Sequence, residues 1–189
     1  MSEADADLRG WMERYQQADP VAPGVLIAAL SPGLLRFFRV LDAGARQAED
    51  LLQDTWLRIH KARHSYRATE PVLPWVYAIA RRVRIDHYRR NRRTMAHEVA
   101  VGDVPEPGGR AGWASGVTNF ETLVGILPEN EREVITLLKA GDLSLEEVAR
   151  ATGSTVGAVK QKAHRAYRRL RKVLENQVPA GVSPGGRES

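Results

Sequence analysis

The sequence predicts an all-α protein of two small helical domains joined by a flexible linker, with a helix-turn-helix in the C-terminal domain. Three observations support this prediction. No segment alternates apolar and polar residues as a half-buried strand would. Several segments instead repeat apolar residues every three or four positions, which is typical of amphipathic helices. Between these segments, residues 94–118 are rich in Gly and Pro and have no apolar period, as expected of a linker.

The N-terminal domain is expected to span residues 21–93, after a polar and flexible segment at 1–20. Apolar residues at helical spacing begin at Ala22 and continue to Leu41. We expect two helices there, broken at 31–33, because Ser can cap a helix and Pro can occupy its first turn. Further along the chain, the same pattern predicts one helix at Ala45–Arg63 and another at Pro74–Arg93. A loop at His64–Leu73 is expected to separate them.

The C-terminal domain is expected at residues 119–176, followed by a disordered tail at 177–189. Thr118 and Glu121 have the spacing of a capping box, in which a hydroxyl and a carboxylate satisfy the free N–H groups at a helix start. We therefore predict a helix that begins there. A second helix is predicted at Glu129–Lys139, where apolar residues recur at helical spacing.

A helix-turn-helix is predicted at Leu143–Lys172. Ser144 and Glu147 form a capping box for its first helix. Gly153 is expected to end that helix, because glycine adopts the left-handed conformation without steric cost. The second helix and its start offer the donors, amide and cations that a DNA major groove requires. The candidate duplex-DNA contacts are Ser154, Thr155, Lys160, Gln161, His164, Arg165 and Arg168.

The positive charge of the chain lies mostly in two blocks. The formal net charge is +5, and residues 81–93 and 160–172 each hold seven Lys or Arg. Two separate basic blocks suggest two separate nucleic-acid contacts. Aromatic residues lie close to the first block, and aromatic rings beside cations are typical of sites that hold unpaired bases. The alternative is two solvated helix faces, although such faces normally mix both signs of charge.

Several classes of function are not supported by the sequence. The chain has no cysteine, which excludes disulfides and thiolate zinc sites. His60 and His64 have a metal-binding spacing but lack the Glu that accompanies it in zinc motifs, so we expect no metal and no cofactor. No catalytic motif is evident, so we expect neither an enzyme nor a small-molecule substrate. The polar N-terminus lacks an export segment, and the longest apolar run, Val25–Leu30, is too short to cross a bilayer, so we expect a cytoplasmic protein.

Two parts of the chain resemble a known protein family. AEDLLQDTWLRIHKA (48–62) and PWVYAIARRVRIDHYRRNRR (74–93) resemble the second conserved region of bacterial sigma factors of the extracytoplasmic-function type. LPENEREVITLLKAGDLSLEEVARATGSTVGAVKQKAHRAYRRLRK (127–172) resembles the fourth region of the same proteins. The resemblance implies a protein that binds core RNA polymerase and directs it to promoter DNA. It also implies an anti-sigma factor as a partner, frequently one that is membrane-bound.

The resemblance further implies a role for each cluster of residues. An acidic helix face would bind core polymerase through Glu49, Asp50, Gln53 and Asp54. The loop and helix after it would hold the melted strand of the −10 element through Tyr66, Arg67, Arg81, Arg82, Arg84, Arg89, Arg90 and Arg92. The helix-turn-helix would read the −35 element as duplex. A stand-alone helix-turn-helix regulator with an N-terminal dimerisation or sensing domain is the alternative. A nucleic-acid-processing enzyme is a third reading, without catalytic residues to support it.

Overall fold

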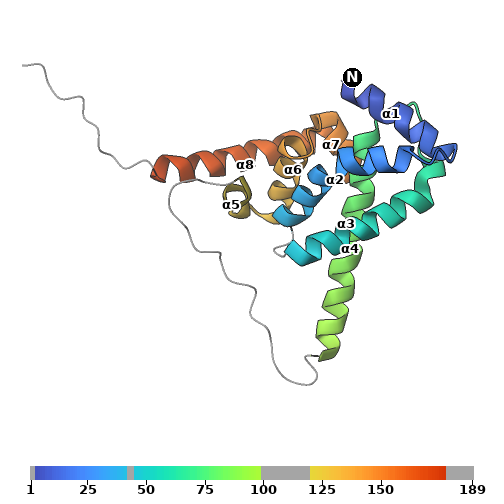
Figure 1. The fold of residues 1–189 in the computed structure, drawn as a ribbon. Helices are drawn as coiled ribbons and strands as arrows, with labels where there is room; N and C mark the ends of the chain where they lie inside the picture. The colour runs from blue at the N-terminus through green and yellow to red at the C-terminus, as the bar shows by residue number, and fades with distance from the viewer. Residues whose placement is uncertain (1–2, 42–44, 99–119, 178–189) are drawn as a thin grey trace, which may run out of the picture.

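The computed structural model describes residues 3–41, 45–98 and 120–177, and every regular element in these ranges is a helix (Figure 1). The N-terminal half contains α1 (Glu3–Gln16), α2 (Ala22–Leu41), α3 (Ala45–Ala62), the short 3-10 helix η1 (Arg63–Ser65) and α4 (Val72–Glu98). The C-terminal half contains α5 (Phe120–Gly125), α6 (Glu129–Lys139), α7 (Leu145–Thr152) and α8 (Val156–Gln177). The all-α prediction is confirmed. Most of the predicted linker and tail lies outside the described residues.

The N-terminal segment is helical, which corrects the prediction of a flexible segment at 1–20. Its helix, α1, packs against α2, η1 and α4. Met12 and Tyr15 point into the core and are 1% and 7% exposed. The segment is polar on average, so its composition does not indicate a packed helix. Met12 and Tyr15 are three positions apart, however, and that spacing places both on one helix face.

Helix α2 is continuous from Ala22 to Leu41, so the predicted break at 31–33 is wrong. A proline inside a helix costs about 3 kcal/mol. Each large apolar side chain that is fully buried contributes about 1.5–3 kcal/mol, and α2 buries such side chains on both sides of Pro32, including Leu30 and Leu34. Trp56 of α3 also donates a hydrogen bond from Nε1 to Ser31 Oγ at 3.0 Å. Packing therefore outweighs the local signal.

Among the described residues, α2 is the one helix long and apolar enough to cross a membrane by length and composition, with a mean hydropathy of 1.6. Core helices of soluble proteins share this length and composition. Its buried face packs on α1 and α3 and on the C-terminal half.

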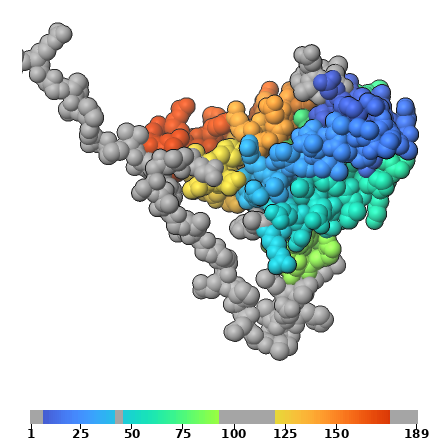
Figure 2. Space-filling view, viewed as in Figure 1, coloured from blue at the N-terminus to red at the C-terminus, as the bar shows by residue number. Residues whose placement is uncertain are grey.

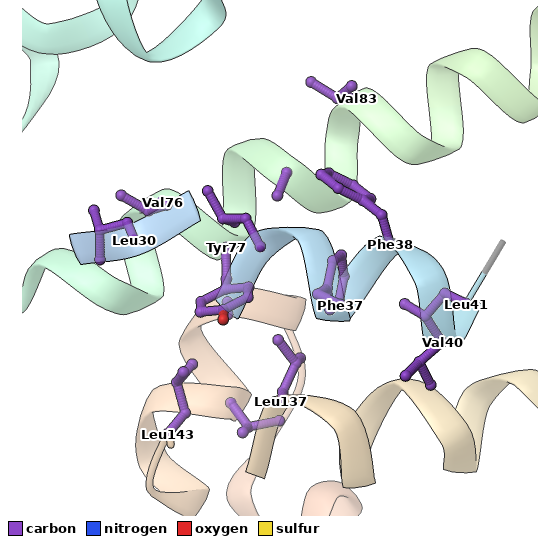
Figure 3. Close-up of a cluster of buried hydrophobic side chains, with 14 of the residues drawn as sticks. Leu30, Phe37, Phe38, Val40, Leu41, Val76, Tyr77, Val83, Leu137 and Leu143 are labelled. Carbon is purple, nitrogen blue, oxygen red and sulfur yellow. The ribbon is translucent and has the colours of Figure 1, made fainter. Parts of the chain in front are cut away.

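The two halves of the molecule pack against each other across a seam (Figure 2). On one side of the seam lie α2 and α4, and on the other lie α5, α6 and α7. Tyr77 of α4 is 3% exposed and packs edge-on against Phe37, with ring centroids 5.5 Å apart. Leu137 and Leu143 of the C-terminal half lie beside it (Figure 3). The buried apolar residues of the two halves therefore form one cluster.

Two glycines allow Tyr77 to approach both sides of the seam. A Cβ atom at Gly33 of α2 would lie 2.9 Å from the Tyr77 hydroxyl oxygen. A Cβ atom at Gly141, in the turn after α6, would lie 3.1 Å from Tyr77 Cζ and 2.8 Å from the Leu137 carbonyl oxygen. These distances leave no room for a side chain. Burial also raises the pKa of the Tyr77 hydroxyl, which keeps it neutral at the seam.

Candidate nucleic-acid interface

The helix-turn-helix is built by the local signals that the sequence predicts. Ser144 Oγ accepts a hydrogen bond from the Glu147 backbone N–H at 3.2 Å, and the Glu147 carboxylate accepts one from the Ser144 backbone N–H at 2.8 Å. Gly153 ends α7 with φ 63° and ψ 33°, in the left-handed region. Thr155 Oγ1 then accepts a hydrogen bond from the Ala158 backbone N–H at 3.2 Å and caps α8. The predicted capping box and glycine stop are confirmed.

The predicted duplex-DNA residues mostly lie on the outer face of α8. Lys160, Gln161, His164, Arg165 and Arg168 are all exposed. The buried face of the same helix consists of small residues, with Val159, Ala163 and Ala166 at most 7% exposed. Tyr167 is 45% exposed, because Ala166 takes the inward position at this turn of the helix.

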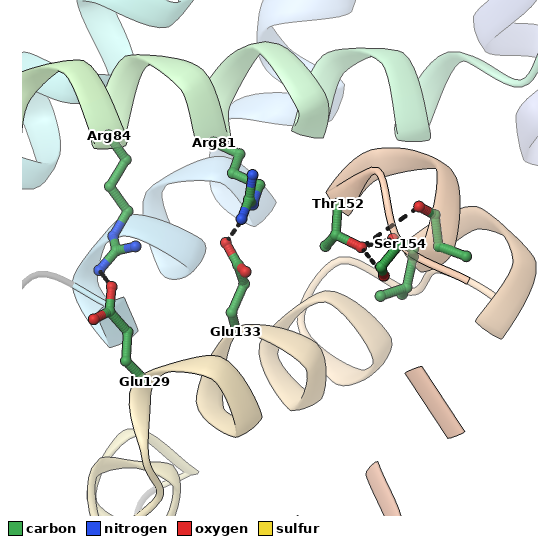
Figure 4. Close-up of polar contacts among 8 residues, drawn as sticks. Arg81, Arg84, Glu129, Glu133, Thr152 and Ser154 are labelled. Atoms are coloured by element: carbon green, nitrogen blue, oxygen red, sulfur yellow. Dashed lines mark hydrogen bonds and ion pairs between the residues drawn. The ribbon is translucent and has the colours of Figure 1, made fainter. Parts of the chain in front are cut away.

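The two residues at the start of α8 have local roles. Ser154 Oγ shares a hydrogen bond with Thr152 Oγ1 at 2.7 Å (Figure 4), and Thr155 caps the helix. Their hydroxyls thus hold the turn that aims α8. Both side chains lie at the same end of α8 as Lys160.

A buried carboxylate, which the sequence reasoning missed, holds two arginines of α8. The Glu131 side chain on α6 is 5% exposed and contacts Arg165 Nε at 3.5 Å and Arg169 Nε at 3.0 Å. Both arginine side chains remain about half exposed. Glu131 thus restrains the two arginines while about half of each side chain stays accessible. Acidic residues in the first turn of a helix are common because the helix dipole favours them, so the sequence position of Glu131 does not indicate this role.

The basic residues of α4 divide into a covered group and an exposed group. Arg81 Nε donates to Glu133 at 2.9 Å, and an Arg84 Nη nitrogen donates to Glu129 at 2.7 Å (Figure 4). Both carboxylates belong to α6 in the C-terminal half. The Arg81 and Arg84 side chains are 32% and 10% exposed, so the seam covers part of the predicted −10 face. The exposed group comprises Arg82, Arg89, Arg90 and Arg92.

The C-terminal part of α4, which carries Arg89, Arg90 and Arg92, projects from the molecule (Figure 1), whereas Arg82 lies nearer the middle of the helix. Arg90 is 3.7 Å from Asp54 of α3, a long contact between two largely exposed groups. Asp86 on the same helix accepts a hydrogen bond from Arg58 at 2.7 Å, which holds the pKa of the Asp86 carboxyl below its usual range. Arg89, Arg90 and Arg92 thus form a positive surface on the projecting part of α4, and Arg82 adds an exposed cation further back on the same helix.

Tyr66 lies in the core, whereas the sequence suggests an exposed ring that stacks on bases. It is 4% exposed, and its ring meets Trp75 edge-on with centroids 5.5 Å apart. Its hydroxyl donates to the Glu70 carbonyl at 2.6 Å. Arg67, the next predicted DNA contact, is exposed in the turn that follows. In this conformation, therefore, Tyr66 supports the loop from inside and Arg67 is the accessible residue.

The predicted polymerase-binding residues lie on one outer face of α3. Glu49, Asp50 and Gln53 are exposed, and Asp54 is half-exposed beside Arg90. The inner face of the same helix is buried through Ala48, Leu51, Thr55 and Ile59. The structure thus leaves an acidic surface next to the basic surface of α4.

His60 takes part in a contact with another helix. Its Nδ1 lies 2.8 Å from the Tyr15 hydroxyl. In the described ranges, no three His, Cys, Asp or Glu residues come together as a possible metal site.

Models of two protein families match the chain in order. Residues 26–94 match Sigma-70 region 2, and residues 118–170 match Sigma-70, region 4. The chain is 30% identical over 166 residues to the RNA polymerase sigma factor CarQ of Myxococcus xanthus, which covers 86% of this chain and 95% of CarQ. It is 32% identical over 178 residues to the ECF RNA polymerase sigma factor ShbA of Streptomyces griseus, covering 87% and 93%.

Solved structures resemble the fold. The sigma factor RpoE of Bartonella quintana, in complex with the anti-sigma factor NepR, matches with a TM-score of 0.65 at 25% identity, over 80% of this chain and 95% of that one. CnrH, in complex with the cytosolic domain of CnrY, matches with a TM-score of 0.63 at 23% identity, over 93% and 99%. Both likenesses extend across the two helical halves.

Proposed function

This chain belongs to the sigma-70 family, as a sigma factor of the extracytoplasmic-function type that directs promoter transcription, and we propose how its two halves divide that work. The observation that carries the proposal is the presence of two basic surfaces, one on α8, the second helix of the helix-turn-helix, and one on α4. The stand-alone regulator is not favoured, because the family matches cover both halves in order.

We propose that α8 reads the −35 element as duplex DNA. Gln161 and Arg165 have the amide and guanidinium groups that pair with adenine and guanine edges in a major groove. Lys160, His164 and Arg168 extend the same exposed face and suit contacts to phosphate or base. Ser154 and Thr155 contribute by fixing the start of the helix.

We propose that α4 and the loop before it hold the melted −10 strand. Arg82, Arg89, Arg90 and Arg92 provide cations along a single strand, and Arg67 extends from the loop. Arg81 and Arg84 join this surface only when Glu133 and Glu129 release them. Tyr66 supports the loop from within. Opening of the seam between the halves would therefore add Arg81 and Arg84 to the exposed −10 surface.

We propose that the acidic face of α3 binds core RNA polymerase. Glu49, Asp50, Gln53 and Asp54 offer a negative surface that DNA would repel, so a protein partner fits it better. An anti-sigma factor is a further partner we propose, supported by the RpoE–NepR likeness. The proposal includes no catalytic activity, and it places the protein in the cytoplasm, where promoter DNA and polymerase are found.

Transcription in vitro tests the proposal. The purified chain is added to core polymerase with genomic DNA fragments, and transcripts are mapped by their 5′ ends. We expect new start sites that share sequence elements at −10 and −35 and that depend on the added chain. Removal of the C-terminal half should abolish the dependence on the −35 element. Start sites with no shared upstream element would contradict the division of roles.

A further inference from the structure

The C-terminal end of α1 contacts the turn that leads into the −10 loop. Gln16 Nε2 donates hydrogen bonds to two backbone carbonyls, those of Arg63 at 2.7 Å and Tyr66 at 2.9 Å. A side-chain amide nitrogen carries two hydrogens, and both are used here. The two carbonyls lie at the first residue of η1 and just after its last. One side chain thus spans the whole turn.

Neighbouring contacts fix this end of α1 in place. The Tyr15 hydroxyl lies 2.8 Å from His60 Nδ1 at the end of α3, and Tyr15 is 7% exposed. The Arg63 guanidinium lies 5.8 Å from the centroid of the Tyr15 ring, within cation–π range. Gln16 is therefore held on a rigid support rather than on a mobile end.

The other end of the loop is held by Tyr66 itself. Its hydroxyl donates to the Glu70 carbonyl at 2.6 Å, and the Glu70 N–H donates to the Arg67 carbonyl at 2.9 Å. Residues 67–70 are all exposed between these anchors. The loop is thus an exposed turn fixed at its base by Gln16 and across its span by Tyr66.

We propose that Gln16 is a positioning residue for −10 recognition: α1 holds the loop at 66–70 in the shape that receives an unpaired base. This inference rests on the proposed function of the loop. A segment that holds its binding shape about one-tenth of the time binds about tenfold more weakly than one that holds it always. Gln16 need not touch DNA to change its affinity.

The chemistry of the site requires a donor at position 16. A carboxylate of similar size can only accept hydrogen bonds, and here it would face two carbonyl oxygens. Gln16→Glu should therefore disturb the loop more than Gln16→Ala. Gln16→Lys keeps a donor and should retain most of the function. Gln17 is exposed and adjacent, so Gln17→Ala is a matched control.

The test measures DNA affinity in holoenzyme assembled from the full chain and core polymerase. The probes are a labelled single-stranded DNA that wild-type holoenzyme selects from a randomised pool and a duplex selected in the same way. We expect Gln16→Ala to weaken single-strand binding on the order of tenfold, with duplex affinity and polymerase affinity unchanged. Amide exchange should accelerate at 63–70 in this variant and stay at the wild-type rate in Gln17→Ala.

Each outcome decides one of the two ideas. If wild-type holoenzyme selects no single-stranded sequence, the proposed function of the loop fails. If wild type selects one and Gln16→Ala binds it as tightly as Gln17→Ala does, the role of Gln16 fails alone. Should Gln16→Ala not fold, the comparison of Gln16→Lys with Gln16→Glu takes its place, and equal affinities in that pair overturn the inference.

Discussion

At the scale of single residues, Gly153 sets the direction of the DNA-reading helix. Its backbone is in the left-handed region at φ 63°, and its N–H bonds back to the carbonyls of Ala149 and Arg150. Apart from Gly153 itself and its two chain neighbours, no heavy atom lies within 4 Å of the position a Cβ atom would take, so contact with other parts of the fold is not the constraint. The constraint is the backbone itself, because an L side chain in this region meets its own carbonyl oxygen.

We predict that Gly153→Ala lowers the free energy of unfolding by about 1–2 kcal/mol. Gly157 is the matched control, since it lies in α8 with equally open surroundings and no positive φ. Gly157→Ala should leave stability unchanged or raise it by up to about 1 kcal/mol. Urea unfolding of the three proteins measures both effects. Equal changes in the two variants would show that the left-handed turn is not the cause.

At the scale of elements, α3 has a buried inner face and an acidic outer face. Glu49 and Gln53 are four residues apart, as are Asp50 and Asp54, so they form one continuous outer surface. Asp54 also lies beside Arg90, which makes Glu49 and Asp50 the cleaner residues to change.

We predict that Glu49→Lys with Asp50→Lys abolishes co-purification with core polymerase while the fold is retained. Like charges at an interface slow association and cost several kcal/mol. Glu13→Lys with Glu175→Lys gives the same change in net charge at exposed positions on α1 and α8. That control should bind polymerase normally. Circular dichroism checks the fold, and retained binding by the α3 variant would place the polymerase contact elsewhere.

The elements also show which parts of the fold local sequence can predict. The helix-turn-helix was predictable because its signals are local, with Ser144 and Glu147 three residues apart. The continuity of α2 across Pro32 was not, since it depends on packing against other helices. The burial of Tyr66 and Arg84 was not predictable either. Tyr66 packs against Trp75, and Arg84 pairs with Glu129, which lies 45 positions away in the sequence.

For the candidate site, too, the features that depend on local sequence were predictable and the contacts between helices were not. Exposed positions on α8 and α3 follow from helical periodicity, which places polar residues outward. Glu131, Glu133 and Gln16 were missed because each acts on a partner from another helix. Acidic residues at the start of a helix such as α6 are common for reasons of the helix dipole alone. No signal in the sequence distinguishes those that also hold an arginine.

At the scale of the whole molecule, the two halves are held together by charge as well as by apolar contact. Arg150 of α7 is 2.8 Å from Glu70 in the loop, with both side chains about half exposed. Such surface pairs contribute about 0–1 kcal/mol. The pairs of α6 with α4 involve more buried groups, because the Glu133 and Arg84 side chains are 11% and 10% exposed. Removing one partner of those pairs should therefore cost more than breaking the pair at Arg150, because a nearly buried charged group takes part in each of them.

We predict that Glu129→Gln with Glu133→Gln opens the seam, because the double change removes two ion pairs that join α6 to α4, Glu133 with Arg81 and Glu129 with Arg84. The chain has no cysteine, so two labels at Lys61→Cys and Lys172→Cys, one in each half, report the separation by energy transfer. The mean distance should increase in the variant and in wild type at high salt. Glu146→Gln with Glu175→Gln removes the same charge from exposed sites and should leave the distance unchanged.

Opening should also strengthen binding of the free chain to single-stranded DNA, because two more arginines of α4 become available. If the distance stays constant while DNA binding rises, the carboxylates compete with DNA by charge alone, and closure depends on the apolar contacts around Tyr77.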